Sequence, residues 1–278
     1  MICRVFPRRT NSSPDDQHAY FTEPDLFTPR YKEAHVSCVF TWDIPRAKAL
    51  AKSWESHAEK VIIGGPAFNS YAKDFMPGMY LKKGITITTR GCPNNCNYCF
   101  VPIREGKLRE LPIKEGHIVQ DNNILRSSEK HIDSVFKMLR KQKKPISFTG
   151  GIDVYALNDN FIEKLRTIKL SSLFLAYDKP AQRNAVQKAV EKLRKYFKWR
   201  QLMVYCLIGY KGDTIEAARE RLDFIIDIGA TPFAQKERIP VEDFKQSFTQ
   251  YSREWNQLNR EYSNRYILAT KHKAKGRP

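Results

Sequence analysis

This sequence contains no long apolar run. No stretch approaches the ~18 consecutive apolar residues of a membrane-spanning helix, which predicts a protein that does not associate with a membrane. The first ten residues, MICRVFPRRT, also lack the apolar stretch of a secretory signal peptide. We therefore expect a cytoplasmic protein whose cysteine thiols stay reduced. With 41% hydrophobic and 12% aromatic residues over 278 positions, the composition supports a packed core and excludes a disordered chain.

Acidic residues are scarce relative to basic ones. The chain has 30 Asp and Glu against 48 Lys and Arg, which gives a formal net charge of +18. Such an excess favours a polyanionic partner, and nucleic acid is the obvious candidate. The alternative is a solvated, lysine-rich surface, because the charge is spread over segments 137–144 and 191–200 and the end of the chain, KHKAKGRP. The sequence leaves both interpretations open.

The chain also lacks a second cysteine pair that could complete a zinc site. Cys92, Cys96 and Cys99 lie on one short stretch with the spacing CxxxCxxC, and the other three cysteines are isolated or fall within an expected strand. Structural zinc sites close with four protein ligands, and electron-transfer clusters commonly use four cysteines. Three thiolates on one loop instead suit a [4Fe–4S] cluster with one iron open to an exogenous ligand.

From residue 84 onward, strand patterns alternate with helix patterns. We expect strands at 84–89, 117–123, 146–151, 172–178, 201–209 and 231–238. The helix after the second strand is expected to begin at Ser127 or Ser128, and the helix after the fifth at a capping box formed by Asp213 and Glu216. Repeated β-then-α units predict an α/β fold with a parallel sheet. The chain has fewer of these units than the eight of a closed barrel, so we expect a partial (β/α)₆ TIM-type barrel.

The two ends of the chain differ from this middle part. A strand at 35–40, a helix that begins around Asp43 and Pro45, and a buried strand at 60–68 form a small βαβ element. We therefore divide the chain into a truncated N-terminal α/β element (1–75), a core partial barrel (76–240), and a C-terminal helix with a basic tail (241–278). The apolar stripe of that helix is expected at Phe244, Phe248, Tyr251, Trp255, Leu258 and Tyr262.

Over residues 84–238 the chain resembles the radical S-adenosylmethionine (SAM) enzymes. The resemblance is carried by CxxxCxxC with an aromatic residue, Tyr98, before the third cysteine, by the strand before the loop, and by the βα units after it. It implies that Cys92, Cys96 and Cys99 hold a [4Fe–4S] cluster and that the open iron binds SAM. It also implies reductive cleavage of SAM to a 5′-deoxyadenosyl radical, which requires a reductase or a flavodoxin-type electron donor.

The resemblance further implies where SAM contacts should lie. Tyr98 matches a position beside the adenine, and Asp178 could reach the ribose. Two strand ends, QDNN and FTGGID, match the positions of SAM-binding segments only by their place in the chain; they contribute Asp121, Asn122, Asn123, Gly150, Gly151 and Asp153. The carboxyl ends of parallel strands are where ligands bind in such folds, although Asn and Asp at strand ends also serve ordinary turn and capping roles.

The segments VIIGGPAF, CNYCFVPIREG and LIGYKGDT resemble radical SAM enzymes that carry an N-terminal cobalamin-binding domain. That domain normally supplies a DxHxxG motif. Here Asp16 and His18 fit, but Phe21 replaces the glycine and the domain is reduced to a fragment. We therefore expect no cobalamin binding.

Three functions remain in competition. The first is a radical SAM enzyme that modifies a nucleic acid or nucleotide, and the second is a radical SAM enzyme that acts on a small metabolite or peptide. The third is a metal-stabilised nucleic-acid-binding protein without catalysis, in which zinc occupies the cysteines. No residue outside the cofactor site can be recognised from the sequence as a substrate contact.

Overall fold

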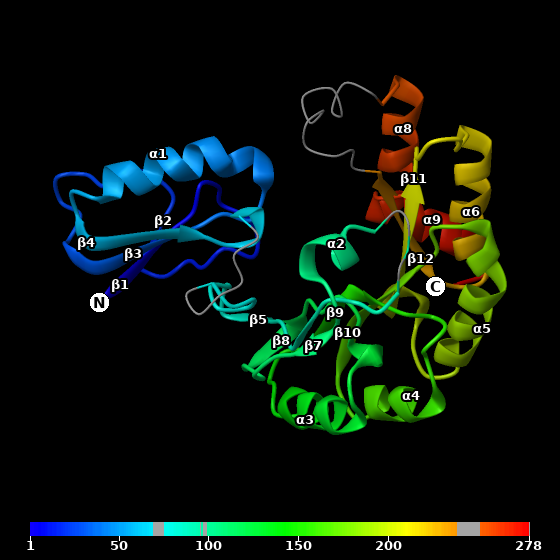
Figure 1. The fold of residues 1–278 in the computed structure, drawn as a ribbon. Coiled ribbons are helices and arrows are strands. Elements are labelled where there is room, and N and C mark those ends of the chain that lie inside the picture. Colours follow the sequence, from blue (N-terminus) through cyan, green and yellow to red (C-terminus); the bar gives the residue numbers. More distant parts are fainter. Residues whose placement is uncertain (69–74, 95, 97–98, 238–250, 278) are drawn as a thin grey trace.

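The computed structural model describes residues 1–68, 75–94, 96, 99–237 and 251–277. Two parallel sheets organise them (Figure 1). The central sheet has the strand order β12-β11-β10-β9-β8-β5. Its strands are β5 (Gly84–Thr86), β8 (Gly116–Val119), β9 (Ile146–Ile152), β10 (Leu170–Ala176), β11 (Leu202–Ile208) and β12 (Thr231–Lys236). Every ladder between them is parallel, which confirms the α/β fold with a parallel sheet.

Helices fill the connections between successive strands of the central sheet. They are α3 (Glu129–Leu139), α4 (Asp159–Arg166), α5 (Arg183–Arg194) and α6 (Ile215–Asp227). In the described part of the chain no ladder joins the edge strands β5 and β12, so these strands do not close into a complete barrel. Short 3₁₀ turns complete the connections: η3 (Ile124–Arg126), η4 (Pro180–Gln182) and η5 (Trp199–Gln201).

Side-chain caps set where these helices begin. The Ser128 hydroxyl accepts a hydrogen bond from the backbone N–H of His131, so the expected start of α3 is confirmed at Ser128. The prediction for α6 was wrong by one residue, because Thr214 is the cap and accepts from Ala217. Asp213 instead forms a buried ion pair with Arg221 at 2.8 Å.

One apolar core joins the central sheet to its helices. The rings of Phe136, Phe148 and Phe161, from α3, β9 and α4, meet with centroids 5.4 to 6.2 Å apart. All three side chains are buried. The core therefore fixes α3 and α4 against the sheet and leaves the strand ends free to carry polar side chains.

The N-terminal sheet is larger than the expected βαβ fragment. It has the order β2-β1-β3-β4, formed by β1 (Ile2–Val5), β2 (Ala19–Tyr20), β3 (Tyr31–Ser37) and β4 (Ala58–Gly64). The sequence analysis missed β1 and β2, which are only four and two residues long. Helix α1 (Ile44–Trp54) packs on one face through Ala47, Leu50 and Trp54. The turns η1 (Thr41–Asp43) and η2 (Pro66–Phe68) follow β3 and β4.

The C-terminal part also departs from expectation. Instead of one helix and a basic tail, the described residues form α8 (Arg253–Glu261) and α9 (Arg265–Ala274). The expected stripe positions Phe244 and Phe248 lie outside the described residues. Asn264 caps α9, and His272 near its end is fully buried and stacked on Trp199, with ring centroids 3.9 Å apart. The last turn of α9 is therefore packed, not a free tail, because an aromatic stack covers its histidine.

Candidate functional site

The cysteine loop begins where β5 ends. The expected strand 84–89 breaks after Thr86, and a two-residue strand β6 (Thr89–Arg90) pairs in antiparallel fashion with β7 (Arg109–Glu110). Asp121, just beyond β8, causes the break. One of its carboxylate oxygens accepts from the backbone N–H groups of Thr88 (2.6 Å) and Thr89 (3.0 Å), and the other accepts from the Thr88 hydroxyl. The entry to the loop is thus tied to the end of the neighbouring strand.

The next two residues after Asp121 also hold the loop. Asn122 Oδ1 accepts from the backbone N–H of Gly91 at 3.1 Å. Gly91 has a positive φ of 83°, and a side chain there would collide with the carbonyl oxygen of Lys107, 2.2 Å from the position of a Cβ. Asn123 donates its amide to Cys92 Sγ at 3.4 Å. Asp121, Asn122 and Asn123 therefore all contact the cysteine loop or the residues that lead into it.

The cysteine side chains lie at intermediate depth, neither in the core nor fully in solvent. The backbone N–H of Cys99 donates to the carbonyl of Cys96 at 3.0 Å. Burial raises the pKa of the Cys99 thiol, and the neighbouring Cys96, Cys92 and Asp178 raise it further through their charges. Tyr98 lies outside the described residues. Helix α2 (Val101–Glu105) follows the loop, and Cys92 N–H returns to the Gly106 carbonyl at 3.3 Å.

Asp153, at the end of β9, joins three segments. One carboxylate oxygen accepts from Asn94 in the cysteine loop (2.8 Å), from Asn123 (3.3 Å) and from Arg126 (3.0 Å). Burial opposes ionisation, but these donors outweigh it and hold the pKa of Asp153 below its ordinary value. The carboxylate therefore stays charged at neutral pH and orients Asn123 toward Cys92.

The glycines that precede Asp153 permit a close approach between strands. A Cβ on Gly150 would lie 1.7 Å from the Asp121 carbonyl oxygen, which no side chain could occupy. Gly151 adopts a positive φ of 88° and has open space around it. Gly150 thus serves the packing of β9 on the segment after β8, and Gly151 lies within β9 where its register against β10 shifts.

Asp178 follows β10 and completes the row of strand-end carboxylates. One of its oxygens accepts from the Leu207 backbone N–H at 3.0 Å, and within the described residues the other makes no hydrogen bond. Burial raises the pKa of Asp178 to about 6, despite the Leu207 N–H and the nearby Arg221. Asp178 is near enough to the cysteine loop for its charge to contribute to the raised pKa of the Cys99 thiol.

Sequence reasoning missed several contributors to this site. Thr88, Asn94 and Arg126 were not singled out, yet each donates to one of the strand-end carboxylates. Only Asn94 carried a usable signal, because it is a polar residue inside the cysteine loop. Thr88 and Arg126 look like ordinary strand and turn residues, and their partners lie 33 and 27 positions away.

The residues present fit a [4Fe–4S] cluster by the chemistry of the donor set. Three thiols share one loop at the strand ends, and Asn123 supplies an N–H donor to Cys92 Sγ, the kind of outer contact that orients a metal ligand. The thiols are not already arranged as a finished metal site. In the described residues, no group of three or more His, Cys, Asp or Glu side chains has that geometry. The fit therefore rests on the donors and their surroundings.

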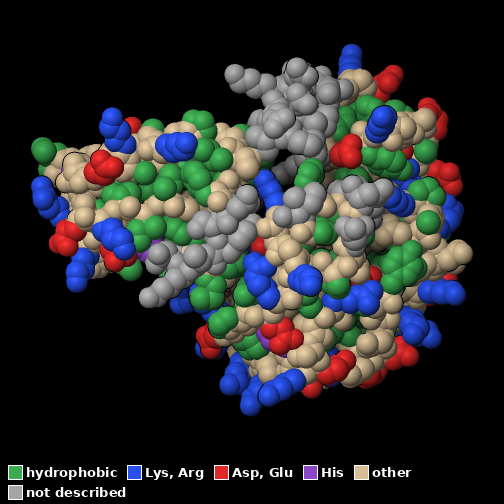
Figure 2. All heavy atoms as spheres, in the orientation of Figure 1, with side chains coloured by type: hydrophobic (Ala, Val, Ile, Leu, Met, Phe, Trp, Pro, Cys, Tyr) green, Lys and Arg blue, Asp and Glu red, His purple; other side chains and the backbone are tan. Residues whose placement is uncertain are grey.

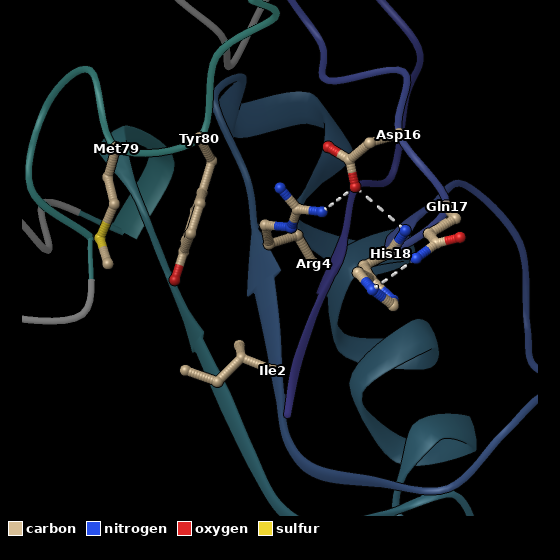
Figure 3. A pocket seen from close by; sticks show the side chains of 7 residues that line it. All are labelled: Ile2, Arg4, Asp16, Gln17, His18, Met79 and Tyr80. Atoms are coloured by element: carbon tan, nitrogen blue, oxygen red, sulfur yellow. Dashed lines mark hydrogen bonds and ion pairs between the residues drawn. The ribbon is translucent and has the colours of Figure 1, made fainter. Parts of the chain in front are cut away.

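The Asp16–His18 pair lies in the turn just before β2, at an open pocket (Figure 3). Asp16 pairs with Arg4 and accepts from the His18 backbone N–H at 3.0 Å. The His18 ring nitrogens lie 3.2 Å from the Tyr31 hydroxyl and 3.2 Å from the Gln17 amide. A cobalt ion would have to displace one of these neighbours. Whether cobalamin binds stays a prediction.

Charged side chains show no single dominant patch on the face in Figure 2, where Lys and Arg are spread over both sheets with Asp and Glu among them. None of the helices in the described part of the chain has the length and apolar character needed to cross a bilayer. Neither a scan against protein-family models nor a search of curated proteins finds a match to this chain.

Proposed function

We propose that this protein is a radical SAM enzyme built on a partial (β/α)₆ barrel. One observation carries the proposal. The loop that bears Cys92, Cys96 and Cys99 lies at the carboxyl edge of a parallel sheet, and the polar ends of the next three strands gather around it. The sequential strand order and the helices between neighbouring strands support the barrel.

The three cysteines would hold a [4Fe–4S] cluster. When bound, such a cluster supplies the electron that cleaves the sulfonium of SAM, giving methionine and a 5′-deoxyadenosyl radical that takes a hydrogen atom from the substrate. The protein's own contribution is to position SAM beside the loop and to exclude water. Asp121 and Asn122 keep the loop against β8, and Asp153 keeps Asn123 beside Cys92.

Asn123 is the best-supported SAM contact. Its amide nitrogen faces two acceptors, Cys92 Sγ and Asp153 Oδ2, which fixes the orientation of the amide and leaves Oδ1 pointing elsewhere. That oxygen is buried and has no hydrogen-bond partner among the residues that the structure describes. An unpartnered buried acceptor beside a cluster ligand suits the methionyl ammonium group, which carries three donors. The unengaged oxygen of Asp178 is a second acceptor, suited to a ribose hydroxyl.

The test is anaerobic reconstitution of the full chain, followed by iron and sulfide analysis and an assay for 5′-deoxyadenosine with dithionite or a flavodoxin system. We expect about four irons per chain and slow SAM cleavage. Replacing any one of Cys92, Cys96 or Cys99 by Ala should abolish both. Replacing Cys206, a buried core thiol in β11, should leave iron content intact.

An Asn123→Ala variant separates SAM contacts from metal ligands. It should bind SAM at least tenfold more weakly while it keeps most of its iron, whereas Asn160→Ala on the exposed face of α4 should change neither. Stoichiometric zinc without iron would instead support the metal-stabilised binding protein. A four-iron protein that never forms 5′-deoxyadenosine, even with cell extract as a source of substrate, would leave only a structural cluster.

A further inference from the structure

A cavity of about 300 Å³ lies between the N-terminal sheet and the central sheet. From the N-terminal sheet it is lined by Ser37, the last residue of β3, and by Gly65, which follows β4. From the central sheet it is lined by Ile87 after β5 and Gln120 after β8. We call this cavity the inter-sheet pocket.

The carboxyl edges of both parallel sheets open onto the inter-sheet pocket. This edge is where open α/β sheets bind their ligands, since strand-to-helix loops meet there. At the pocket, Gln120 after β8 reaches the connection between β1 and β2, where its amide donates to the Ser12 hydroxyl at 3.5 Å. Gly65 has a positive φ of 102°, and a Cβ there would lie 2.7 Å from the Cys38 carbonyl oxygen. Only glycine therefore allows β4 to turn at the pocket wall.

One wall of the inter-sheet pocket belongs to the frame of the cysteine loop. Arg90 is two residues before Cys92, and Glu105 is the last residue of α2, the helix that follows Cys99. Arg90 donates to the Gln120 carbonyl at 3.2 Å. A ligand in the pocket would therefore lie next to the segment on which the cluster and SAM are proposed to bind.

The lining is apolar and aromatic with neutral polar groups at intervals. Its apolar side chains include Phe40, Phe75, Met76 and Tyr80. Phe40 is stacked on Trp42, which lies outside the lining, with ring centroids 4.7 Å apart and planes 12° from parallel, so the orientation of the Phe40 ring is fixed. The polar groups are the hydroxyls of Thr10, Ser12 and Ser37 and the amide of Gln120. Such walls suit a flat ring that carries hydrogen-bonding groups.

The charged side chains in the wall already have partners in each other. Glu105 is 4.0 Å from Arg90 and 3.1 Å from Arg109. The Glu105 side chain is only 12% exposed, so its charge is compensated by these two guanidinium groups and not by solvent. Among the described lining residues no carboxylate is left unopposed, so the pocket disfavours a cationic ligand and accepts a neutral one.

We propose that the inter-sheet pocket binds a nucleobase, as the part of the substrate on which the enzyme acts. That the bound base is the group on which the enzyme acts rests on the proposed function, whereas the binding of a base to the pocket does not. A neutral planar ring with donors and acceptors fits the aromatic and hydroxyl lining, and bases stack readily on aromatic side chains. The volume of about 300 Å³ is near the lower limit for ligand pockets, so the cavity holds one base with its sugar and not a base pair. The base comes from a free nucleoside or from a single strand.

The test uses the full chain after anaerobic reconstitution, with SAM present. Two probes are titrated: the four 2′-deoxynucleosides, and a single-stranded mixed-sequence DNA of fifteen nucleotides. In Val39→Trp an indole fills the pocket from a residue that is 46% exposed, so the core is not disturbed. Val39→Ala leaves the pocket open, and Leu26→Trp adds the same indole at a 91% exposed site outside it. Thermal melting checks that all three fold.

We expect Val39→Trp to weaken binding at least tenfold, and Val39→Ala and Leu26→Trp to stay within twofold of the parent. Binding of a nucleoside identifies the free source, and binding of the oligonucleotide alone identifies a base in a strand. No binding of either probe at millimolar concentration, or binding that Val39→Trp leaves unchanged, would overturn the proposal. Iron content and 5′-deoxyadenosine are measured on the same samples. Base binding without SAM cleavage would refute the proposed function only, and cleavage without base binding would refute the inference only.

Discussion

Asp121 offers the sharpest test of how the cysteine loop is held. Both backbone amides that lead into the loop, those of Thr88 and Thr89, donate to the same carboxylate oxygen of Asp121. The side chains of these threonines are buried, so Asp121→Ala would leave two N–H groups without an acceptor. A buried donor that loses its partner costs about 1–3 kcal/mol. We expect Asp121→Ala to lower the free energy of unfolding by about 3–4 kcal/mol.

Asp121→Asn should behave very differently. Asparagine keeps one oxygen where both amides donate, and the Thr88 hydroxyl can turn to accept from the new amide nitrogen. Burial raises the pKa of Asp121, so the substitution also removes a carboxylate whose charge the site disfavours. We expect Asp121→Asn to stay within about 1 kcal/mol of the parent. The measurement is urea denaturation at pH 7, with Asp133→Ala, an exposed residue of α3, as the control.

Iron retention in the two Asp121 variants should change in parallel with their stability. Asp121→Ala should lose iron on reconstitution, because the loop entry is no longer tied to β8, and Asp121→Asn should retain it. The reasoning would be refuted if Asp121→Ala lowers stability by less than about 1 kcal/mol, or if both variants lower it equally. A pair of stable variants that keep iron but bind SAM weakly would show instead that Asp121 is a direct SAM contact.

Three further predictions concern the rest of the chain. Burial lowers the pKa of His272 to about 4, so the neutral ring stabilises the fold above pH 6.5. This contribution to the free energy of unfolding, up to about 3 kcal/mol, is lost as the pH falls toward 4. His272→Phe should keep the stack on Trp199 and flatten the decline in melting temperature between pH 7 and 4.5. We expect no cobalamin to co-purify, and a His18-dependent cobalamin spectrum would contradict this. If duplex DNA binds through about six phosphates, log K against log salt should have a slope of about −5. Charge reversal should then weaken binding at Lys195, Lys198 and Arg200.

Much of the fold was predictable because the information is local. Apolar residues at helical spacing and a capping hydroxyl predicted α3, and its cap lies at Ser128 as expected. Successive βα units require parallel strands with sequential neighbours, and the central sheet has that order. The cysteine spacing likewise identified the loop at the carboxyl edge of the central sheet. Periodicity failed where elements were very short, as in β1 and β2, since two to four residues carry no period.

What the tertiary structure alone decided is which polar groups meet. Asp121, Asn122 and Asn123 looked equivalent in the sequence, yet Asp121 holds Thr88 and Thr89, and Asn122 holds Gly91. Of the three, only Asn123 keeps a buried acceptor that has no partner in the described part of the chain. These contacts join residues about thirty positions apart. Their choice depends on strand register and on the close approach that Gly150 permits, which no local pattern encodes. The inter-sheet pocket has the same origin, because it exists only where the carboxyl edges of two separate sheets face each other.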